Sequence, residues 1–461
     1  MRVLIDYRPA LRERSGVGEY THELARALLA RYPPDDPRRA LELTLFSSSW
    51  KDRFERSSDL AGAARIDRRV PVSVLNLAWH RLGWPPIETL AGAAFDVAHS
   101  SHPLLMPARA AAQVITIHDL NFLSHPERTD AEIRRDYPDL VGEHARRADA
   151  VIVSSAFAAD EVARRLGVAR EQIAVCPPGV PDWQPRASAP ANGYLLFFGT
   201  LEPRKNIGGL LDAYERLIAR VDHGPAKAGH YRSHGGGDHD DGPAEAGHYR
   251  GHGGMDHDDG PAEAGHYRDR DRHDGGDGGA GSSATALEAE RSAKASAERH
   301  GGTPPLPPLI LAGRATSAAQ PWLDRIARPP LAGRVRHVGY VDPSQRHDLY
   351  VGARLLVQPS FEEGFGITVL EAMSLGVPVV AARRGSLPEV TADAAVLVDP
   401  DSSEDLAHGI ERMLRDEAFA TECAGKGLAR ARAFQWSTTA QRVFDTYEQA
   451  VARRARRTGA A

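Results

Sequence analysis

The sequence predicts an α/β protein made of two Rossmann-like domains, each built on a doubly wound parallel sheet. Short apolar runs alternate with amphipathic helical stretches along most of the chain, which is typical of parallel sheets that carry helices on both faces. A small, polar stretch at residues 186–193 separates two such series and is typical of a linker. We therefore predict a first domain at 1–185, a second at 186–430, and a terminal helix with a basic tail at 431–461.

The first series contains the apolar runs that we predict as the strands of the first sheet. They are residues 3–6, 43–46, 95–101, 113–119, 148–155 and 173–179. Between them, Leu24, Ala27 and Leu28 form an apolar stripe at helical spacing, which predicts a helix over 21–32. Residues 160–166 have a similar helical pattern.

The second series predicts a second sheet with its own helices. Its strands are residues 194–200, 309–313, 335–341, 355–357, 377–382 and 395–400. Helical spacing of apolar residues covers 367–375 and 402–414. The second of these helices should begin at a cap formed by Ser402 or Ser403, because acidic residues follow in its first turn.

Composition excludes several classes of protein. The 461 residues include 57 basic and 62 acidic ones, so the chain lacks the basic excess of a nucleic-acid-binding protein. Its two cysteines, Cys176 and Cys423, provide neither a disulfide framework nor zinc-ligand spacing. Neither a signal peptide nor an apolar stretch of about 18 residues is present. We therefore expect a cytoplasmic protein.

Residues 223–300 interrupt the second series with a repeat. The sequence GPAKAGHYRSHGGGDHDD recurs twice with changes, at a period of 18 residues, and Leu287 is the single leucine of the segment. Such a segment cannot bury enough apolar surface to offset its ordering entropy, so we expect it to be disordered. A repeated DNA element translated in frame explains it without a function. Weak binding of Zn²⁺ or Ni²⁺ by its histidines is the alternative.

Two glutamates flank the start of the helix predicted at 367–375. Glu363 lies in the polar loop between a buried strand and this helix, and Glu371 lies about two turns further on. In open parallel sheets ligands bind beyond the carboxyl ends of the strands. Gly364 and Gly366 allow the backbone to approach a ligand, and the first N–H groups of the helix favour anions. A long, polyhydroxylated diphosphate fits this arrangement, with a sugar at one end and a ribose at the other.

Two further loops have residue types that suit a phosphate. Arg204 and Lys205 follow the strand at 194–200, and a planar fork beside a point charge suits a diphosphate. Gly16 and Gly18 lie between the first strand and the first helix, which is a phosphate-loop arrangement in outline. A solvated charge pair and a glycine-rich turn are the respective alternatives.

His118 and Asp119 end the strand at 113–119. A lone histidine after a strand is more often structural, but the carboxyl end of a strand in this sheet faces the expected cleft. His102, on a neighbouring strand end, is a second candidate. Ser154 and Ser155 are expected to cap the helix that follows them.

Several of these segments together resemble one enzyme family. The stretch PSFEEGFGITVLEAMSLGVPVVA, in which Glu363 and Glu371 are separated by seven residues, resembles the E-x7-E motif of retaining glycosyltransferases of the GT-B fold, in particular group 1 (GT4). GTLEPRKNI resembles the donor-phosphate motif of that family, and GSLPE resembles its G-G-x-P-E turn with Ser in place of the second Gly. The resemblance covers the whole chain except 223–300 and implies two domains facing each other across a cleft. It also implies that the final helix crosses back to the first domain.

The resemblance assigns roles to the candidate residues. Glu371 would hold the ribose of a nucleotide sugar, and Glu363 would hold the transferred sugar together with the amides of the loop, which belong to Gly364, Phe365 and Gly366. Arg204 and Lys205 would stabilise the leaving diphosphate, helped by the loop of Gly16 and Gly18. His118 would contact the sugar from the first domain, oriented by Asp119.

The resemblance also implies a reaction. Transfer would retain configuration by same-face attack, with Glu363 as nucleophile remaining an alternative, and it would need neither a metal nor another cofactor. The segments TIHDLNFLSHPE and HSSHPLLMP look most like mannosyltransferases that use GDP-mannose, with UDP-glucose or another hexose donor as the alternative. The acceptor would be a glycan or a lipid-linked saccharide.

Two other classes remain open. One is a sugar-nucleotide epimerase on the same fold, and the other is a non-catalytic glycan-binding protein. Peripheral contact with an anionic membrane through the basic tail, Arg453 to Arg457, is a further hypothesis.

Overall fold

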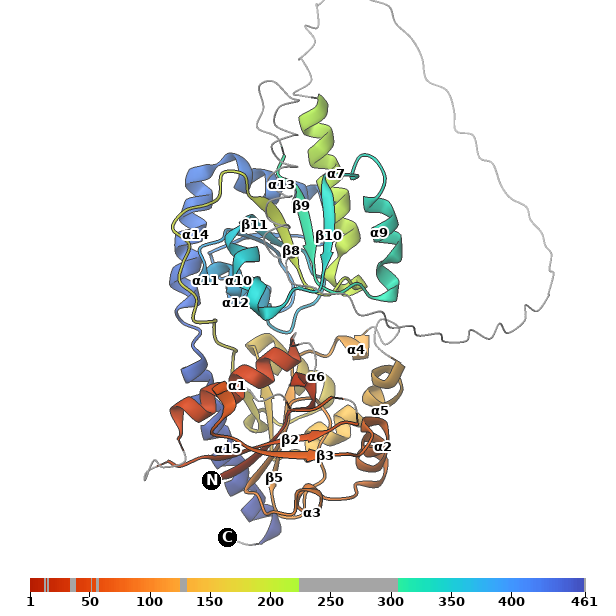
Figure 1. The fold of residues 1–461 in the computed structure, drawn as a ribbon, viewed down its shortest axis with the longest axis vertical. Coiled ribbons are helices and arrows are strands. Elements are labelled where there is room, and N and C mark those ends of the chain that lie inside the picture. The colour runs from red at the N-terminus through yellow and green to blue at the C-terminus, as the bar shows by residue number, and fades with distance from the viewer. Residues whose placement is uncertain are drawn as a thin grey trace, which may run out of the picture.

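The computed structural model contains two parallel sheets, each in a domain of its own (Figure 1). It describes residues 1–11, 14, 16–33, 39–50, 52–54, 58–124, 131–223 and 306–459. Apart from residue 223, the repeat segment lies outside the described residues, and so does our expectation about its order. The predicted fold class, two Rossmann-like domains, is confirmed.

The first sheet has seven parallel strands in the order β3-β2-β1-β4-β5-β6-β7. The strands are β1 (Arg2–Asp6), β2 (Glu42–Ser48), β3 (Ala64–Arg68), β4 (Val97–Ser100), β5 (Ala112–Ile117), β6 (Ala150–Val153) and β7 (Ile173–Val175). The sequence analysis missed β3. It is an edge strand that pairs only with β2 and alternates small, charged and apolar residues, so it lacks the apolar run of a buried strand.

The second sheet has six parallel strands in the order β10-β9-β8-β11-β12-β13. The strands are β8 (Tyr194–Phe198), β9 (Leu309–Ala312), β10 (Val335–Gly339), β11 (Ala353–Gln358), β12 (Val379–Ala382) and β13 (Val396–Val398). Each lies within or overlaps an apolar run of the second series. The order reverses beside β8 and β11, which is where ligands bind in such sheets.

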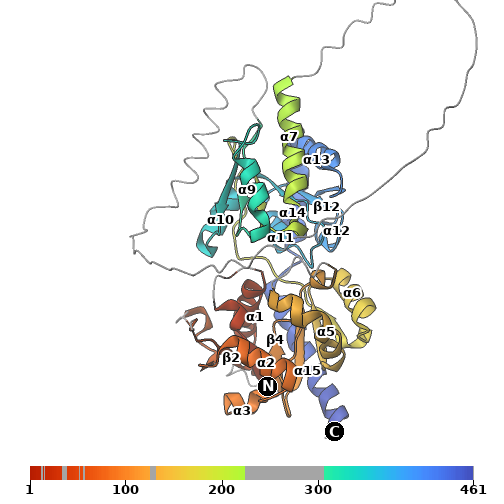
Figure 2. The ribbon, with the colours of Figure 1, turned by 90° about the vertical axis from the view of Figure 1, so that its right-hand side faces the viewer.

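Helices cover both faces of each sheet (Figures 1 and 2). In the first domain they are α1 (Val17–Arg31), α2 (Val72–Leu77), the single π-helical turn η3 (Ala78–Leu82), α3 (Ile87–Ala91), α4 (Asn121–Ser124), α5 (Ala131–Arg147) and α6 (Ala156–Leu166). In the second they are α7 (Ile207–His223), α9 (Gln320–Ile326), α10 (Pro343–Val351), α11 (Ile367–Ser374), α12 (Leu387–Thr391), α13 (Ser403–Arg415) and α14 (Glu417–Ala431). Short 3₁₀ turns, η1 (Arg8–Ala10) and η6 (Pro203–Lys205), follow β1 and β8.

Side-chain caps explain where several helices start. The hydroxyl of Ser155 accepts from the backbone N–H of Ala158 and caps α6, as expected for this serine. Of the two serines proposed to cap the helix at 402–414, Ser402 does so, because its hydroxyl accepts from Asp405 N.

The last helix, α15 (Trp436–Thr458), packs on the first sheet and on α1, although it follows the second domain in the chain (Figure 1). The Tyr447 hydroxyl lies 2.7 Å from His99 Nδ1 in the buried core. Its basic end is bound to the first domain, because Arg453 and Arg457 donate to the backbone carbonyls of Asp149 and Arg147. Contact of this tail with an anionic membrane stays a prediction.

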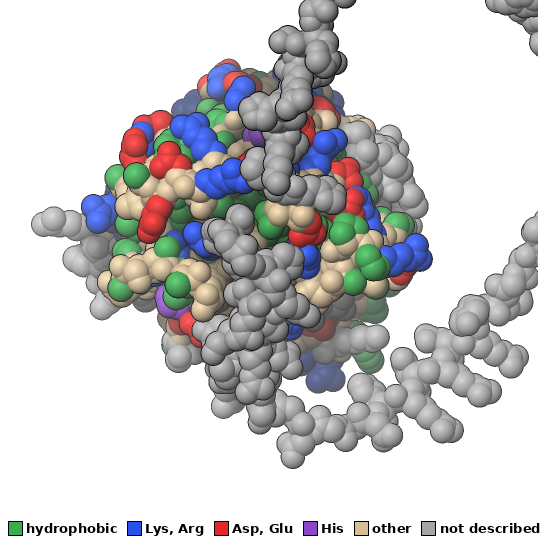
Figure 3. Space-filling model, turned by 90° about the horizontal axis from the view of Figure 1, so that it is seen from above, with side chains coloured by type: hydrophobic (Ala, Val, Ile, Leu, Met, Phe, Trp, Pro, Cys, Tyr) green, Lys and Arg blue, Asp and Glu red, His purple; other side chains and the backbone are tan. Residues whose placement is uncertain are grey.

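The C-terminal end of α7 lies far from the first domain. The last residue of α7 lies at the end of the second domain that points away from the first domain in both ribbon views (Figures 1 and 2). Seen from that end, basic and acidic side chains are intermixed over the described surface (Figure 3). Within the described residues, no helix combines the length and the apolar content needed to cross a bilayer.

Candidate functional site

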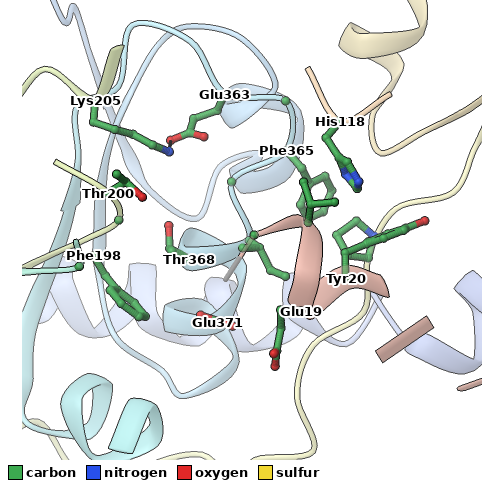
Figure 4. Close-up of a pocket in the computed structure, with 18 of the residues that line it drawn as sticks. Glu19, Tyr20, His118, Phe198, Thr200, Lys205, Glu363, Phe365, Thr368 and Glu371 are labelled. Atoms are coloured by element: carbon green, nitrogen blue, oxygen red, sulfur yellow. Dashed lines mark hydrogen bonds and ion pairs between the residues drawn. The ribbon is translucent and has the colours of Figure 1, made fainter. Parts of the chain in front are cut away.

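A cleft with a cavity of about 280 Å³ lies between the two domains, at the carboxyl ends of both sheets. Nine of the ten residues that the sequence nominated for catalysis or donor binding line it: Gly16, His118, Arg204, Lys205, Glu363, Gly364, Phe365, Gly366 and Glu371. His118 and Tyr20 of the first domain lie on one side of it, and Lys205 and Glu363 of the second lie on the other (Figure 4). The structure thus brings together residues from four loops that are far apart in the sequence.

Gly18 is the one of these ten residues that does not line this cleft. It is buried in the first turn of α1, where an added Cβ would lie 2.5 Å from the carbonyl oxygen of Pro9. Its missing side chain therefore allows α1 to pack against η1. Gly16 does line the cleft, with φ of 50°, in the region that favours glycine.

The carboxylate of Glu363 is held by three donors. Its Oε1 lies 2.5 Å from Lys205 Nζ, 2.7 Å from Ser360 Oγ and 2.8 Å from Gln358 Nε2. Its Oε2 lies 3.5 Å from Arg204 Nη1. Glu363 is 6% exposed, so these contacts form away from bulk water. The side chain that we expected to hold the transferred sugar is thus also the counter-ion of the predicted phosphate-binding lysine.

This geometry sets the charge state of the pair. Burial raises the pKa of Glu363, but Lys205 and Arg204 outweigh burial and lower the pKa to about 2. Burial lowers the pKa of Lys205, as does the neighbouring Arg204, whereas Glu363 raises it. Because the two groups are in direct contact, each favours the charged form of the other.

Glu371 is fixed at the other end of the cleft by two residues of α10. Its Oε1 accepts from Arg346 Nη1 at 2.9 Å, and its Oε2 accepts from the Tyr350 hydroxyl at 2.7 Å. Arg346 also lies 3.6 Å from Glu19 of α1, in the first domain. Burial raises the pKa of Glu19, although Arg346 opposes this effect. The carboxylate proposed to hold a ribose is therefore oriented before any ligand binds.

His118 presents a free ring nitrogen at the cleft. Its Nε2 is buried and has no hydrogen-bond partner among the described residues. Burial lowers the pKa of His118 to about 4, and Asp119 opposes this effect only in part. Asp119, which we expected to orient His118, instead accepts from the backbone N–H of Asn121, and the backbone of Ser101 bonds the His118 ring. A neutral imidazole at this position suits a sugar hydroxyl.

His102, the second histidine candidate, does not line the cleft cavity. Its Nε2 lies 3.2 Å from Asp6 Oδ2, at the end of β1, and Asp6 is also bound by Arg8. This cluster lies in the first domain at the same end of the sheet as His118.

The loop that carries Glu363 is also the contact between the two domains. The hydroxyls of Ser154 and Ser155 donate to the carbonyl of Gly364 at 3.1 and 2.8 Å. Glu389, from the GSLPE turn, accepts from the backbone N–H groups of Ala156 and Phe157 at 2.9 and 3.1 Å. The second domain thus supplies a carboxylate to the start of α6, where the helix dipole favours negative charge.

Sequence reasoning missed the residues that hold Glu371 in place. Arg346 and Tyr350 lie on α10, which has no motif of its own. Glu19 and Tyr20 also line the cleft, directly after the glycine loop. Their place beside Gly18 was the one available signal, since residues that follow a glycine loop in such a sheet face the ligand side.

Two family models match separate parts of the chain. Residues 14–183 match the model described as Glycosyltransferase Family 4, and residues 309–429 match the model described as Glycosyl transferases group 1. The first match includes His118, and the second includes Glu363 and Glu371. The chain belongs to the group 1, family 4 glycosyltransferases.

This glycosyltransferase is similar along its length to the O-antigen chain mannosyltransferase B of Escherichia coli, with 25% identity over 467 aligned positions that cover 97% of this chain and 100% of the relative. Sucrose-phosphate synthase from Thermosynechococcus elongatus has a similar fold, with a TM-score of 0.63, 19% identity, and coverage of 98% of this chain and 99% of that one. HepE from Anabaena, solved in complex with UDP-glucose, has a TM-score of 0.56, 17% identity, and coverage of 97% and 99%. Membership of the family favours a transferase over an epimerase or a non-catalytic protein.

Proposed function

We propose that this glycosyltransferase moves mannose from GDP-mannose to a saccharide acceptor, with retention and without a metal ion. The arrangement of the cleft carries the proposal. Glu371 lies near the middle of α11, and Arg204, Lys205 and Glu363 lie around the loop that precedes this helix. A nucleoside diphosphate sugar lying along α11 would place its ribose at Glu371 and its diphosphate beside the two cations.

Mannose as the transferred sugar is supported by the full-length relative, which is named a mannosyltransferase. UDP-glucose or another hexose donor is the alternative. The experiment below distinguishes these donors by the base of their nucleotide. For the acceptor we propose a glycan or a lipid-linked saccharide that binds on the side of the first domain. His118, with its free Nε2, would then meet the hexose between donor and acceptor.

Charge on the leaving group is stabilised by the second domain in this mechanism. As the glycosidic bond breaks, negative charge develops on the diphosphate, and fixed cations in a site shielded from water stabilise it. Arg204 and Lys205 are the cations that line the cleft beside Glu363. The start of α11 adds N–H groups, because its cap residue, Gly366, has no side chain to satisfy them. These groups take the part that a metal ion plays in other transferases.

The environment of Glu363 argues for direct attack by the acceptor. Three donors bind its Oε1, and the lowered pKa reflects a carboxylate stabilised as an anion, which makes it a poor nucleophile. We therefore propose that the acceptor hydroxyl attacks from the face that the diphosphate leaves. The leaving phosphate takes the proton, and the product retains its configuration.

Thermal unfolding with GDP, UDP and ADP tests the donor assignment. A ligand at 100 times its dissociation constant stabilises a protein by about 2.7 kcal/mol. We expect GDP to raise the midpoint of the wild type and to have little effect on Glu371→Gln, which keeps the volume of the side chain but removes its charge. A shift with UDP alone would replace GDP-mannose by a UDP-sugar, and no shift with any of the three would refute nucleotide binding at this site.

The reaction itself is tested on the product. The anomeric configuration of the transferred sugar, measured by NMR, should match that of the donor. Incubation with EDTA should leave the rate unchanged within a factor of about two. Inversion would refute same-face attack, and a loss of activity restored by Mg²⁺ or Mn²⁺ would refute the metal-independent mechanism.

A further inference from the structure

Glu19 is a carboxylate at the cleft whose hydrogen bonding is incomplete. It lies in the first turn of α1 and lines the cleft. Its Oε2 is buried and has no hydrogen-bond partner among the described residues. Its Oε1 lies 3.6 Å from Arg346 Nη1, which is beyond hydrogen-bonding distance. An ionised carboxylate offers about four acceptor sites, and a buried polar atom without a partner requires an explanation. We therefore looked for the missing donor among the ligands that this cleft would hold.

The neighbouring carboxylate, that of Glu371, is satisfied by contrast. Arg346 and Tyr350 each donate to one of its oxygens. The carboxylates of Glu19 and Glu371 therefore approach Nη1 of the same arginine, one from each domain. Figure 4 shows the two glutamates at the end of the cleft that is opposite Lys205. Glu19 thus has more unfilled acceptor capacity than the residue to which we assigned the ribose.

A purely structural role does not account for Glu19. A carboxylate near the start of a helix can accept from the free N–H groups there, as the Asp416 side chain does at the start of α14. Oε2 of Glu19 makes no such bond within the described part of the chain. Burial raises the pKa of Glu19 in spite of Arg346, which is the direction expected of a carboxylate that lacks donors. Burying the group in this way costs stability, and a ligand that supplies a donor removes the cost.

The backbone that carries Glu19 is held in place by its neighbours in the chain. Gly18 packs so closely against η1 that an added Cβ would lie 2.5 Å from the carbonyl oxygen of Pro9. Tyr20 is buried, and its ring centroid lies 4.9 Å from that of His118. The Glu19 side chain therefore reaches the cleft from a closely packed support in the first domain.

We propose that Glu19 binds a ribose hydroxyl of the donor nucleotide from the first domain. The inference rests on the proposed function, because it takes the ribose to lie at Glu371. A ribose presents two adjacent hydroxyl donors, and the two glutamates supply an acceptor for each. The contact with Arg346 favours the ribose over the base as the partner, because it keeps Glu19 beside Glu371. Oε2 of Glu19 thereby gains the hydrogen bond that it lacks, and bonds to a charged acceptor are the stronger ones.

This contact makes nucleotide binding depend on both domains. Glu19 belongs to α1 and Glu371 to α11, so a ribose held by both bridges the cleft. A ligand that binds the closed arrangement of two domains better than the open one shifts the population toward the closed arrangement. The donor nucleotide would thus help to hold the enzyme closed.

Titration calorimetry of the full chain with GDP, 2′-deoxy-GDP and 3′-deoxy-GDP tests the contact. Glu19→Ala should bind GDP about tenfold more weakly than the wild type. With one of the two deoxy analogues, both proteins should bind within about twofold of each other, because the hydroxyl that donates to Glu19 is absent. Binding of that analogue at wild-type strength also shows that the variant is folded. If UDP is the nucleotide that shifts the unfolding midpoint, the same analogues of UDP are used.

Glu23→Ala is the matched control. Glu23 lies one turn further along α1, its side chain is 18% exposed against 16% for Glu19, and it pairs with Arg26 away from the cleft lining. This variant should bind all three ligands like the wild type.

Tyr350→Phe distinguishes a direct contact from an effect through Glu371. It removes a hydrogen bond to Glu371 and leaves Glu19 unchanged. We expect the losses caused by Glu19→Ala and by Tyr350→Phe to depend on different ribose hydroxyls. If both losses disappear with the same deoxy analogue, Glu19 acts by holding Arg346 in place for Glu371, and the inference is overturned.

The remaining outcomes are equally decisive. A loss in Glu19→Ala that is the same for GDP and for both analogues would overturn the contact with a hydroxyl. If the wild type binds GDP and Glu19→Ala binds it equally tightly, the inference is refuted and the proposed transferase function stands. A wild type that binds no nucleotide would instead refute the proposed function, and the inference with it.

Discussion

Replacing Gly364 by alanine should keep the two domains apart while leaving each of them folded. An added Cβ would lie 1.8 Å from the carbonyl oxygen of His118 and 3.1 Å from Asp119 Cβ, both in the first domain. Real Cβ atoms essentially never approach a backbone atom closer than 3.0 Å, so the two loops must separate by about 1.2 Å or more. His118 directly follows buried strand β5, which cannot retreat, so the domains must move apart.

The expected cost follows from the contacts that this separation breaks. The two serine hydroxyls that donate to Gly364 O at 3.1 and 2.8 Å would exceed hydrogen-bonding distance, at about 1 kcal/mol each. The two N–H groups that donate to Glu389 would be strained as well, and a bond to a charged group contributes somewhat more. We expect closure to lose about 2–4 kcal/mol, which corresponds to a decrease in kcat/KM of roughly 100-fold.

Initial rates of nucleoside diphosphate release measure this loss, and the unfolding midpoint should stay within about 2 °C of the wild type. Small-angle scattering should show a larger radius of gyration for the variant. Gly425→Ala is the matched control, because a Cβ there meets no atom within 4 Å and the position lies inside α14. A Gly364→Ala enzyme that retains kcat/KM within threefold would refute the reasoning, since the close approach would then be unnecessary for turnover.

Three further predictions concern the side chains of the cleft. Glu363→Gln removes the anion 2.5 Å from Lys205 Nζ and should lower kcat about 100-fold or more; a decrease below threefold in initial-rate measurements would contradict this. Tyr350→Phe removes the hydroxyl that binds Glu371; it should weaken nucleotide binding about fivefold by calorimetry, and unchanged affinity would show that Arg346 alone suffices. Burial lowers the pKa of His118 to about 4, from an ordinary value of 6.5. Its imidazole should therefore stay neutral in the folded protein at pH 5–8. As the pH falls, the unfolded chain binds a proton at this residue before the folded chain does. The stabilisation by neutral His118 should thus be complete above about pH 6.5 and be lost as the pH falls toward 4; denaturant unfolding of wild type and His118→Gln over this range should show a difference that shrinks on acidification.

The strands and the site loops were predictable because their signals are local. A buried parallel strand is an apolar run, and the loop after it must supply glycine wherever the backbone approaches a partner. Residues 353–391 contain both signals, which is why β11, α11 and β12 were predicted together with Glu363 and Glu371. β3 was not predicted because it is a partly exposed edge strand and has no run of apolar residues.

Residue type and spacing predicted nine of the residues that line the cleft. The glycines at 364 and 366 and the cations at 204 and 205 each follow an apolar run, so these groups lie at the carboxyl ends of the strands of one sheet. The sequence also determined the family, because its motifs are contiguous.

Only the tertiary structure decided how these groups pair and what else they contact. Glu363 turns to Lys205, Glu371 is held by Arg346, and Gly364 lies against His118. These contacts join segments 25 or more residues apart or lie between domains, and no local periodicity records them. The exposure of Val72, Val74 and Leu77 could not be predicted for the same reason: an apolar residue in a sequence predicts burial, and only the packing of Leu75 and Trp79 shows which neighbours remain exposed.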